Sequence, residues 1–346
     1  MKSLKNKEKT FLVNKKSNDE KQIDFVLRPG NWKDFIGQEK LKNNLKIILT
    51  AAKKRKEAVD HLLFCGPAGL GKTTLACLVA KEMGADIRIT SGAVLERVGD
   101  LIALLSSIEE NEVLFIDEIH RLNRAIEEVL YPALESRQIY VMIGKGPAAR
   151  PLTLDLPPFT LVAATTRPNL LSSPLRSRFG ATFRIDYYEN KDIEDIIFRS
   201  AEILGVKITK GAGEILSRAS RFTPRIANRL LKRARDLAEV SEREIIDEDL
   251  AQETLKFLEI DDLGLESYDR RLLEIIIKKF RGGPAGLATL AAVLGEEKGV
   301  IEDVYEPFLI KIGLLHKTAG GRVASKDAYK HLKIIDNRQP TSDNKY

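Results

Sequence analysis

A stretch of eight residues restricts the fold of this chain more than any other part of its sequence. Residues 66–73 read GPAGLGKT and fit the pattern G-x-x-x-x-G-K-[ST]. The apolar run 61–65 precedes them, and a helical pattern that Gly84 closes follows from Thr73 to Met83. Glycines in such a turn let backbone N–H groups face a phosphate, and the following helix directs its positive dipole end at the same phosphate. A chance glycine turn would have neither flank, so the sequence predicts a phosphate-binding loop.

Two acidic residues about 45 positions after Lys72 predict the rest of the chemistry. Asp117 and Glu118 end an apolar run, and the carboxyl ends of parallel strands meet at one edge of a sheet. We therefore expect both acids beside the loop, where Lys72 would reach the β- and γ-phosphates of ATP and the Thr73 hydroxyl would ligate Mg²⁺. Asp117 would hold the same Mg²⁺ through water, and Glu118 would polarise the attacking water. We interpret the nearby His120 as a packed neighbour rather than a catalyst.

The hydrophobic pattern divides the chain into three parts. Up to about residue 189, apolar runs without alternation, such as 160–164, alternate with helical stretches, which predicts strands buried on both faces of a parallel sheet. Residues 190–258 show only helical spacing. Over 263–332, three helical segments precede a hairpin pattern with glycines at its tip. The predicted fold class is α/β, with a P-loop parallel-sheet domain, an all-helical lid domain and a C-terminal winged-helix domain.

Charge and cysteine content exclude several classes of protein. Lys plus Arg is 56 and Asp plus Glu is 50, a net charge of +6, and residues 1–21 hold seven lysines against three acids. This basic stretch has no apolar period, so we expect a disordered tail, and nucleic-acid contacts in the folded part must come from local placement of charge. Two cysteines exclude a disulfide framework and a cysteine-based zinc site, and favour a reducing compartment. No run approaches 18 apolar residues, so we expect a cytoplasmic protein without a membrane span.

Further motifs follow one another along the chain. Besides the phosphate loop they are 27–29 (LRP), 35–38 (FIGQ), 114–121 (LFIDEIHR), 164–167 (ATTR), 173–180 (SPLRSRFG) and 223–229 (TPRIANR). Over about residues 25–334 the chain therefore resembles the bacterial RuvB family, the AAA+ motors of Holliday-junction branch migration in recombination and DNA repair. The chain departs from the family pattern at Ala68, where proline is usual, at Lys317, where arginine is expected, and at Gly320, where another basic residue is common.

The resemblance implies roles for residues around the nucleotide. Thr166 resembles a polar sensor at the end of a strand, with Thr165 as the alternative, and Arg225 resembles a second sensor on the lid. Arg178 resembles the arginine finger that reaches the ATP of a neighbouring subunit, and Arg176 is close enough to be the alternative. The implied catalytic residues are Lys72, Asp117, Glu118, Thr166, Arg178 and Arg225. The implied nucleotide-binding residues are Leu27, Arg28, Gly69, Gly71, Lys72, Thr73, Thr74, Glu135, Ser136, Arg137, Tyr188 and Arg225.

The resemblance also implies domains and partners. The expected boundaries are a tail at 1–24, an ATPase domain at 25–189, a lid at 190–262, a winged helix at 263–334 and a polar tail at 335–346. Residues 138–156 match a β hairpin that docks RuvA in the family, and two strand-like runs do flank a glycine-containing loop there. Its apolar Ile143 and Leu152 are the expected contacts, the alternative being a hairpin packed on its own domain. A homo-hexamer around the duplex arms of a four-way junction, with RuvC in a larger assembly, completes the implied partners.

Acidic residues on the expected recognition helix argue against sequence reading by the winged helix. The helix at 300–312 carries three acids, which repel phosphates, so deep insertion into a major groove is not expected. Basic residues lie instead on and beside the hairpin, and we expect Lys317 and Arg322 to contact DNA phosphates. The alternative is a solvated charged edge.

Other functions share parts of this pattern. A sliding-clamp loader has the same AAA+ core, but usually carries a Ser-Arg-Cys finger motif and a helical collar, where this chain has residues 173–178 and a winged helix. A nucleotide-gated binding module would not need the complete set of Lys72, Asp117, Glu118 and Arg178. A protein unfoldase would need an aromatic pore loop, which we do not find. ATP turnover that rises with DNA would separate a motor from a passive switch.

Overall fold

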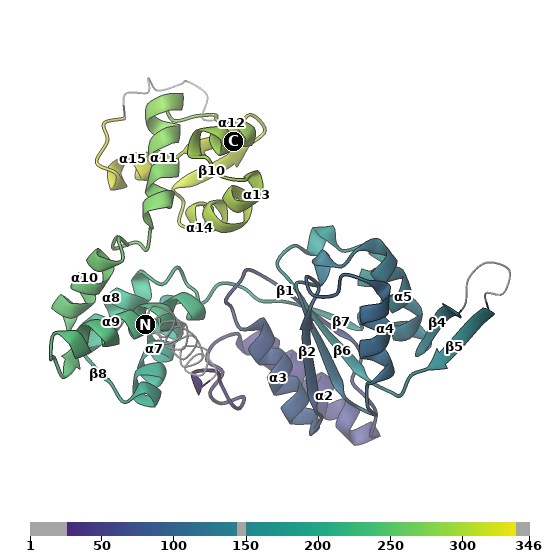
Figure 1. The fold of residues 1–346 in the computed structure, drawn as a ribbon. Helices are drawn as coiled ribbons and strands as arrows, with labels where there is room; N and C mark the ends of the chain where they lie inside the picture. Colours follow the sequence, from purple (N-terminus) through teal and green to yellow (C-terminus); the bar gives the residue numbers. More distant parts are fainter. Residues whose placement is uncertain (1–25, 144–149, 337–346) are drawn as a thin grey trace, which may run out of the picture. The chain divides into compact units, whose positions relative to one another are not determined.

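The computed structural model describes residues 26–143 and 150–336 (Figure 1). The chain forms two compact units. The first unit runs to Gly205 and includes Phe222–Asn228, and the second unit comprises Val206–Arg221 and the chain from Arg229 onward. Helix α7 (Asn190–Leu204) therefore belongs to the first unit, whereas α9 (Pro224–Val240) begins in the first unit and continues in the second.

A five-stranded parallel sheet forms the centre of the first unit. Its strands are β1 (Leu62–Cys65), β2 (Ile87–Ser91), β3 (Val113–Asp117), β6 (Thr160–Thr165) and β7 (Ala181–Arg184). Their order is β2-β3-β6-β1-β7, and each neighbouring pair is parallel. All residues of β1 and β6 are buried, which confirms the prediction of strands covered on both faces. This order places β6 between β1 and β3, so the end of β6 lies between the phosphate loop and the acidic pair.

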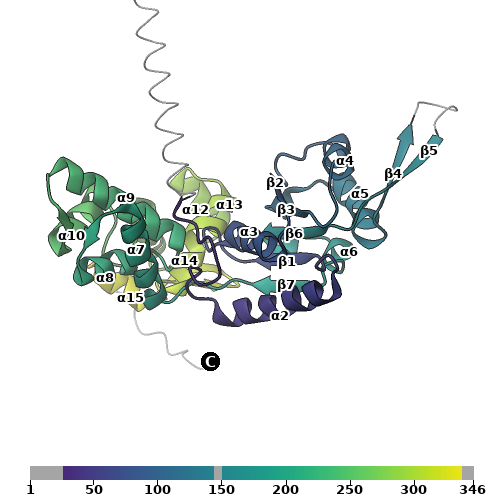
Figure 2. The same ribbon diagram turned by 90° about the horizontal axis from the view of Figure 1, so that it is seen from below.

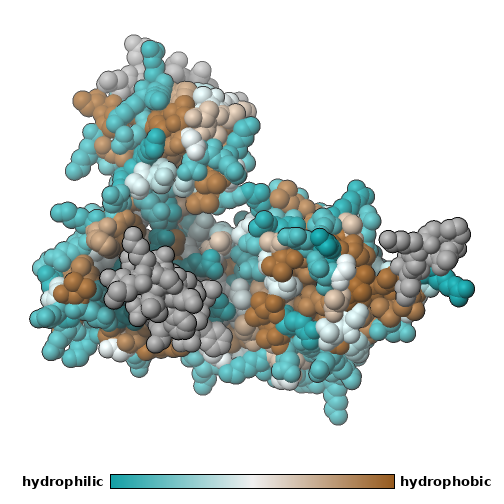
Figure 3. Space-filling model, viewed as in Figure 1, coloured by the Kyte–Doolittle hydropathy of each residue, from teal (hydrophilic) through white to brown (hydrophobic). Residues whose placement is uncertain are grey.

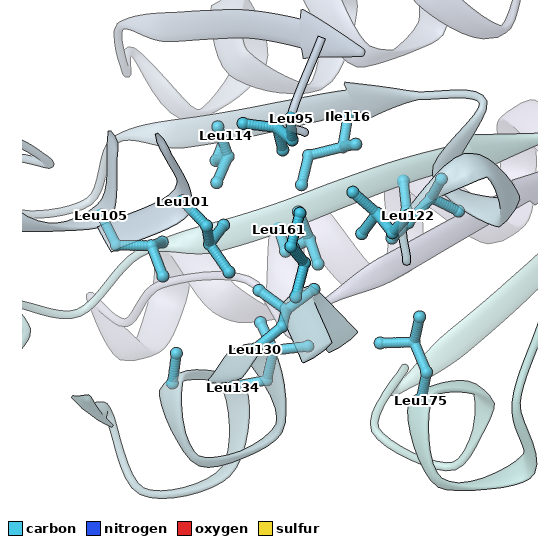
Figure 4. Close-up of a cluster of buried hydrophobic side chains, with 14 of the residues drawn as sticks. Leu95, Leu101, Leu105, Leu114, Ile116, Leu122, Leu130, Leu134, Leu161 and Leu175 are labelled. Atoms are coloured by element: carbon cyan, nitrogen blue, oxygen red, sulfur yellow. The ribbon is translucent and has the colours of Figure 1, made fainter. Parts of the chain in front are cut away.

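Helices cover both faces of the sheet, with α2 and α3 on one face and α4 and α5 on the other (Figures 1 and 2). Their bounds are α2 (Glu39–Arg55), α3 (Lys72–Met83), α4 (Val98–Ser106), α5 (Arg124–Glu135) and the short α6 (Ser173–Arg176). In the layer between the sheet and the helices α4 and α5, Leu101 of α4 and Leu130 of α5 point toward Leu114 of β3 and Leu161 of β6 (Figure 4). Each of these leucines is fully buried, and each contributes about 1.5–3 kcal/mol to stability. The sheet is therefore a rigid support for the loops at its edges.

A two-stranded hairpin projects from the first unit beyond the sheet (Figure 1). It consists of β4 (Gln138–Ile143) and β5 (Arg150–Asp155), paired antiparallel, and the loop at 144–149 lies outside the described residues. Ile139 is fully buried, and Leu154 packs against the main core. Farther from the core, Leu152 on the same face is 40% exposed. The base of the hairpin is thus packed on its own domain, and its outer part is not.

Helices dominate the first part of the second unit. They are α8 (Lys210–Arg218), the continuation of α9, and α10 (Glu248–Phe257). A pair of two-residue parallel strands, β8 (Lys207–Ile208) and β9 (Ile245–Ile246), also joins the segments before α8 and α10. The prediction of a purely helical pattern over 190–258 was therefore wrong in this detail, because two residues are too few to show a strand period.

A winged helix forms the rest of the second unit. It contains α11 (Ser267–Phe280), α12 (Leu287–Leu294), α13 (Lys298–Val300), η4 (Ile301–Tyr305), α14 (Glu306–Lys311), β10 (Leu315–Thr318), β11 (Gly321–Ala324) and α15 (Lys326–His331). The expected helix at 300–312 is widened to a π-helix over η4. Pro307, in the first turn of α14, has no N–H to donate to the preceding turn. None of the helices in the described ranges is long and apolar enough to cross a lipid bilayer.

Candidate active site

The phosphate loop follows β1 and ends at the first turn of α3. Gly71 precedes α3 with φ of 97°, a left-handed conformation that strongly favours glycine. Gly69 has φ of 80°, and a β-carbon there would lie 2.8 Å from the Thr223 methyl group. No side chain caps α3, so its first N–H groups are available to an anion at the positive end of the helix. The predicted loop and helix are confirmed.

The ammonium group of Lys72 is folded onto this loop. Its Nζ donates to the carbonyl oxygens of Gly66 and Pro67, both at 2.8 Å. Burial lowers the pKa of Lys72, and the charges of Glu118 and Asp117 oppose that shift. The cation therefore rests on neutral carbonyl groups, close to the carboxylates, where a phosphate can displace the carbonyls.

The two acids lie at the end of β3, as predicted. Asp117 is the last residue of the strand, and the N–H of Glu118 donates to its Oδ1 at 3.0 Å. Burial raises the pKa of Asp117, although this hydrogen bond acts in the opposite direction. Glu118 adopts a left-handed conformation with φ of 47° and starts the short helix η1 (Ile119–Arg121). The extended conformation of the strand therefore ends between the two acids.

Strand β6 brings two threonines to the same place. The hydroxyl of Thr166 donates to Glu118 Oε2 at 3.1 Å. Thr165 is fully buried, and its Oγ1 accepts from the N–H of Arg167 at 3.0 Å. Thr165 Oγ1 also lies 2.9 Å from His120 Nδ1, which is in turn 3.2 Å from Glu118 Oε2. The expected sensor, Thr166, therefore contacts the acid directly, and the alternative, Thr165, reaches it through His120.

His120 was interpreted from the sequence as a packed neighbour, and the structure gives it polar contacts instead. Its side chain is 10% exposed and meets the acid and Thr165 at the end of the sheet. Burial lowers the pKa of His120, and the charge of Glu118 opposes this effect. Sequence spacing offered no signal for this contact, because Thr165 is 45 residues away along the chain.

Other expected nucleotide-binding residues border the loop. The Tyr188 hydroxyl donates to the Leu70 carbonyl at 3.2 Å, and burial strongly raises the pKa of this tyrosine. The N–H of Arg225 donates to the Gly69 carbonyl at 3.4 Å, and the side chain of Arg225 is exposed. Thr74 is buried in the first turn of α3, and Leu27 is also buried, whereas Arg28 is exposed. Tyr188, Arg225 and Thr74 therefore lie at the loop, whereas the nucleotide contacts expected of Leu27 and Arg28 stay predictions.

The expected finger lies at the opposite edge of the sheet. The N–H of Gly180 donates to the His61 carbonyl at 2.9 Å, and a ring nitrogen of His61 lies 3.1 Å from the Leu134 carbonyl oxygen. His61 immediately precedes β1, so Arg178 and the segment after Leu134 sit at the amino end of that strand, about 13 Å from the loop at its carboxyl end. The structure therefore does not bring Glu135, Ser136, Arg137 or Arg178 to the phosphate loop of their own chain.

Arg178 is tightly held where it lies. Its Nη2 donates to Glu135 Oε2 at 2.8 Å, its Nη1 donates to the Pro174 carbonyl at 2.7 Å, and its guanidinium carbon lies 4.7 Å from the centre of the Tyr131 ring. Arg176 is exposed and makes no ion pair within the described part of the chain. A role in trans is compatible with the positions of both arginines. Of the two guanidinium groups, that of Arg178 is the one already held in a fixed orientation.

The donor atoms fit Mg²⁺ only together with phosphate. Among residues 26–143 and 150–336 no group of three or more His, Cys, Asp or Glu side chains could hold a metal ion alone. Thr73 and Asp117 offer one hydroxyl and one carboxylate. Mg²⁺ commonly takes one or two protein oxygens and completes its shell with phosphate and water, so this sparse set suits it.

The prediction for Arg322 at the wing was wrong. Its side chain is only 9% exposed, and its Nε and Nη2 donate to the two oxygens of Glu306 at 2.6 and 3.1 Å. Nη2 also donates to Glu302 Oε1 at 3.0 Å. A guanidinium buried against two carboxylates is not available to DNA phosphates. Lys317 is 53% exposed, with its Nζ 3.2 Å from Glu302, so its phosphate contact stays a prediction.

The hairpin contacts are described only in part. The backbone of Ile143 lies in β4, but its side chain is outside the described residues. Tyr140 is 57% exposed and Leu152 is 40% exposed. Hydrophobic residues also reach the surface of the first unit in the view of Figure 3.

Sequence comparison matches family models along almost the whole described chain. Residues 27–185 match the Holliday junction DNA helicase RuvB P-loop domain, residues 188–261 the RuvB AAA lid domain, and residues 262–333 the RuvB C-terminal winged helix domain. A solved structure of the Thermotoga maritima RuvB Holliday junction branch migration motor is 48% identical, with a TM-score of 0.83, covering 90% of this chain and 99% of that chain. A lysine-to-arginine mutant of the same protein is 49% identical, with a TM-score of 0.82, covering 89% and 98%.

Proposed function

The chain belongs to the RuvB family of Holliday junction DNA helicases, and from this premise we propose which residues carry its reaction. As a RuvB-type AAA+ ATPase it is an ATP-driven motor of branch migration. The single observation that supports our assignment is the meeting of Lys72, Asp117, Glu118 and Thr166 at the carboxyl edge of the parallel sheet. Fold alone would support many chemistries, whereas this set is specific to phosphate transfer.

Each group has a role that its position allows. The loop N–H groups and Lys72 bind the β- and γ-phosphates, and Thr73 with Asp117 would hold Mg²⁺. When bound, Mg²⁺ neutralises charge that develops on the phosphate oxygens. Glu118 orients the attacking water and accepts its proton, and Thr166 fixes the carboxylate that does so.

Completion of the site requires a second subunit. Arg178 and the Glu135–Arg137 segment lie at the amino edge of the sheet, so they would serve the ATP of a neighbour, while Arg225 serves the ATP of its own chain. The family resemblance suggests that the ring is a homo-hexamer. We place its action in the bacterial cytoplasm, on duplex arms of the junction.

The exposed part of the hairpin is the proposed docking site for RuvA, and a larger assembly with RuvC is proposed on the family resemblance. Leu152 and the outer strand positions provide an apolar contact without a function in the ATPase site. Leu152→Ser should reduce RuvA-dependent branch migration while the intrinsic ATPase rate stays the same. Thr153→Ser, on the opposite face of the same strand, is the matched control. Equal loss of both activities in Leu152→Ser would point to a packing role instead.

The function is tested by migration of a synthetic four-way junction with and without RuvA. We expect ATP-dependent migration that RuvA stimulates, and ATP turnover that rises with added duplex. Glu118→Gln should bind ATP, hydrolyse it about 10²–10⁴-fold more slowly, and not migrate the junction. Normal turnover in Glu118→Gln would contradict the role given to Glu118.

A further inference from the structure

The side chain of His120 lies between two groups of the active site that no sequence motif connects. Its Nδ1 is 3.2 Å from Glu118 Oε2 and 2.9 Å from Thr165 Oγ1. Neither phosphate binding nor the finger uses this residue. We propose that His120 is a positioning residue, whose Nδ1–H, together with the Thr166 hydroxyl, holds the Glu118 carboxylate in the orientation required for hydrolysis. This inference rests on the proposed role of Glu118 as the group that orients water.

The tautomer follows from the neighbours of Nδ1. An ionised carboxylate can only accept hydrogen bonds, so a lone pair on Nδ1 facing Glu118 Oε2 at 3.2 Å would be repelled. A proton on Nδ1 removes this repulsion and allows donation to the carboxylate. Thr165 Oγ1, which already accepts from the Arg167 N–H, can also accept from this proton. We therefore assign the proton to Nδ1.

The two donors act on the same oxygen of the carboxylate. Thr166 Oγ1 donates to Oε2 at 3.1 Å, and His120 Nδ1 approaches the same atom. The other oxygen, Oε1 of Glu118, has no hydrogen-bond partner within the described residues. Two donors from different segments, one directly after β6 and one in η1, fix the rotation of the carboxylate about its terminal bond, and Oε1 is left to accept from a water molecule.

Thr165 helps to hold the Glu118 carboxylate through its contact with His120. It is fully buried, and its hydroxyl lies within hydrogen-bond distance of both the imidazole and the backbone of Arg167. The imidazole is thus held in its plane at Nδ1 and cannot turn away from Glu118 without losing both contacts. This explains how a side chain on a short 3-10 helix can hold a carboxylate in place.

The test replaces His120 with three residues that differ in where they place an N–H. In Asn the amide nitrogen is as far along the side chain as Nδ1, in Gln it corresponds to Nε2, and Ala has neither. We expect His120→Ala to lower kcat for ATP about 10- to 100-fold, as for the loss of one hydrogen bond to a charged group. KM for ATP and the Kd of a non-hydrolysable ATP analogue should stay within about 2-fold, because phosphate binding is unchanged. His120→Asn should recover most of the rate, and His120→Gln should not.

A double-mutant comparison separates this inference from the assignment of Glu118. In a Glu118→Gln background, His120→Ala should cause no further loss of kcat, because both changes act on the same group. Full activity of Glu118→Gln would overturn the assignment of Glu118 and this inference with it. A slow Glu118→Gln enzyme together with a fully active His120→Ala enzyme would overturn the role of His120 alone.

Two further outcomes count against the proposal. Equal losses of kcat in His120→Ala, His120→Asn and His120→Gln, with unchanged analogue binding, would mean that the Nδ1 hydrogen bond is not the cause. A parallel rise in the Kd of the analogue in all three variants would mean that His120 only packs the site.

Discussion

Two clusters of charged side chains in this molecule have similar composition and opposite character. Within the described residues at the carboxyl edge of the sheet, Lys72 Nζ donates only to carbonyl oxygens, and Oε1 of Glu118 has no hydrogen-bond partner. In the winged helix, Arg322 closes a bidentate pair with Glu306, and both side chains are buried. The charges of the first cluster stay available for a ligand, whereas the charges of the second cluster pair with one another.

The difference shows what a functional charge requires. A buried ion pair with satisfied hydrogen bonds contributes to the fold, and breaking it leaves a costly unpaired charge. A charge that is held by neutral dipoles keeps its attraction for a phosphate. From its residue type and its position on a hairpin, Arg322 could have been either a charge available to DNA or a member of a buried ion pair. These two possibilities differ in the partner of the guanidinium, which the sequence does not show.

The strongest test of the comparison is Arg178, which has a partner in its own chain and a proposed target in another. Arg178→Ala should bind ATP normally and lower kcat about 10³–10⁵-fold, the usual worth of an arginine finger. Mixing Arg178→Ala with Lys72→Ala should restore part of the activity at hybrid interfaces, measured by ATP turnover. Arg176→Ala tests the alternative finger and should keep a kcat close to that of the parent, and a mixture no more active than the sum of its parts would argue against action in trans.

The next largest effect should come from Arg322. Arg322→Met removes both hydrogen bonds to buried Glu306 and leaves it only Lys317 Nζ, 3.9 Å away, so the free energy of unfolding of the winged helix should fall by up to about 3–5 kcal/mol. Lys317→Met removes an exposed pair and should cost at most about 1 kcal/mol. Denaturant unfolding, monitored through the hydrogen exchange of backbone amides in the winged helix, measures the loss of stability in both variants. Equal, small effects would show that the wing cluster is as open as the active site.

A second buried pair gives a pH-dependent test. In the second unit, Arg221 contacts Asp269 and lies over the Phe308 ring at 4.4 Å. Burial raises the pKa of Asp269 to about 6, although Arg221 lowers it. Ionised Asp269 therefore destabilises the fold above that pH, and the penalty disappears as the pH falls toward the unfolded value, about 3.9.

Without the guanidinium, the pKa of Asp269 should rise farther. Arg221→Met should therefore destabilise the protein more at pH 8, where Asp269 is charged, than at pH 5, where it takes up a proton. The unfolding free energy of the variant minus that of the parent is measured at pH 8 and at pH 5, and the two differences are compared. The contributions of the other carboxylates are the same in both proteins, so they cancel in each difference. A difference that is independent of pH would show that Asp269 is not the partner that matters.

The smallest expected effect concerns DNA. With Arg322 excluded, Lys317→Ala should reduce the slope of log K against log salt by about 0.9 for each subunit engaged, one phosphate contact rather than two. Affinity should fall similarly for all duplex sequences. Lys330→Ala, an exposed lysine paired with Asp327 outside the hairpin, should leave the slope unchanged. An unchanged slope in Lys317→Ala would remove the wing lysine from the DNA contact.

Features written in consecutive residues were predictable. The loop at 66–73, the acids after β3 and the glycine-tipped wing depend on local backbone geometry, and the structure has them where the sequence placed them. The order of the strands was not predictable from these segments. That order places β6 beside β3 and so brings Thr166 onto Glu118.

Side-chain partners distant in sequence account for the rest. Glu306 is 16 residues from Arg322, and nothing in either segment signals that their side chains are buried together. The two-residue strands β8 and β9 were too short to show a period. In each case a tertiary contact, rather than a local propensity, decided the outcome.

The placement of the loop and of Arg178 at opposite edges of one sheet also limits the symmetry of an active assembly. Two chains related by a two-fold axis use the same surface on both partners, so such a dimer completes both sites only where that one surface holds the loop and Arg178 together. A head-to-tail contact uses the two edges separately, and an open chain of such contacts always leaves one loop without the Arg178 of a neighbour. Closure of head-to-tail contacts into a ring makes the number of complete sites equal to the number of chains, so with the role proposed for Arg178 we expect ATP turnover per chain to rise with protein concentration until rings close.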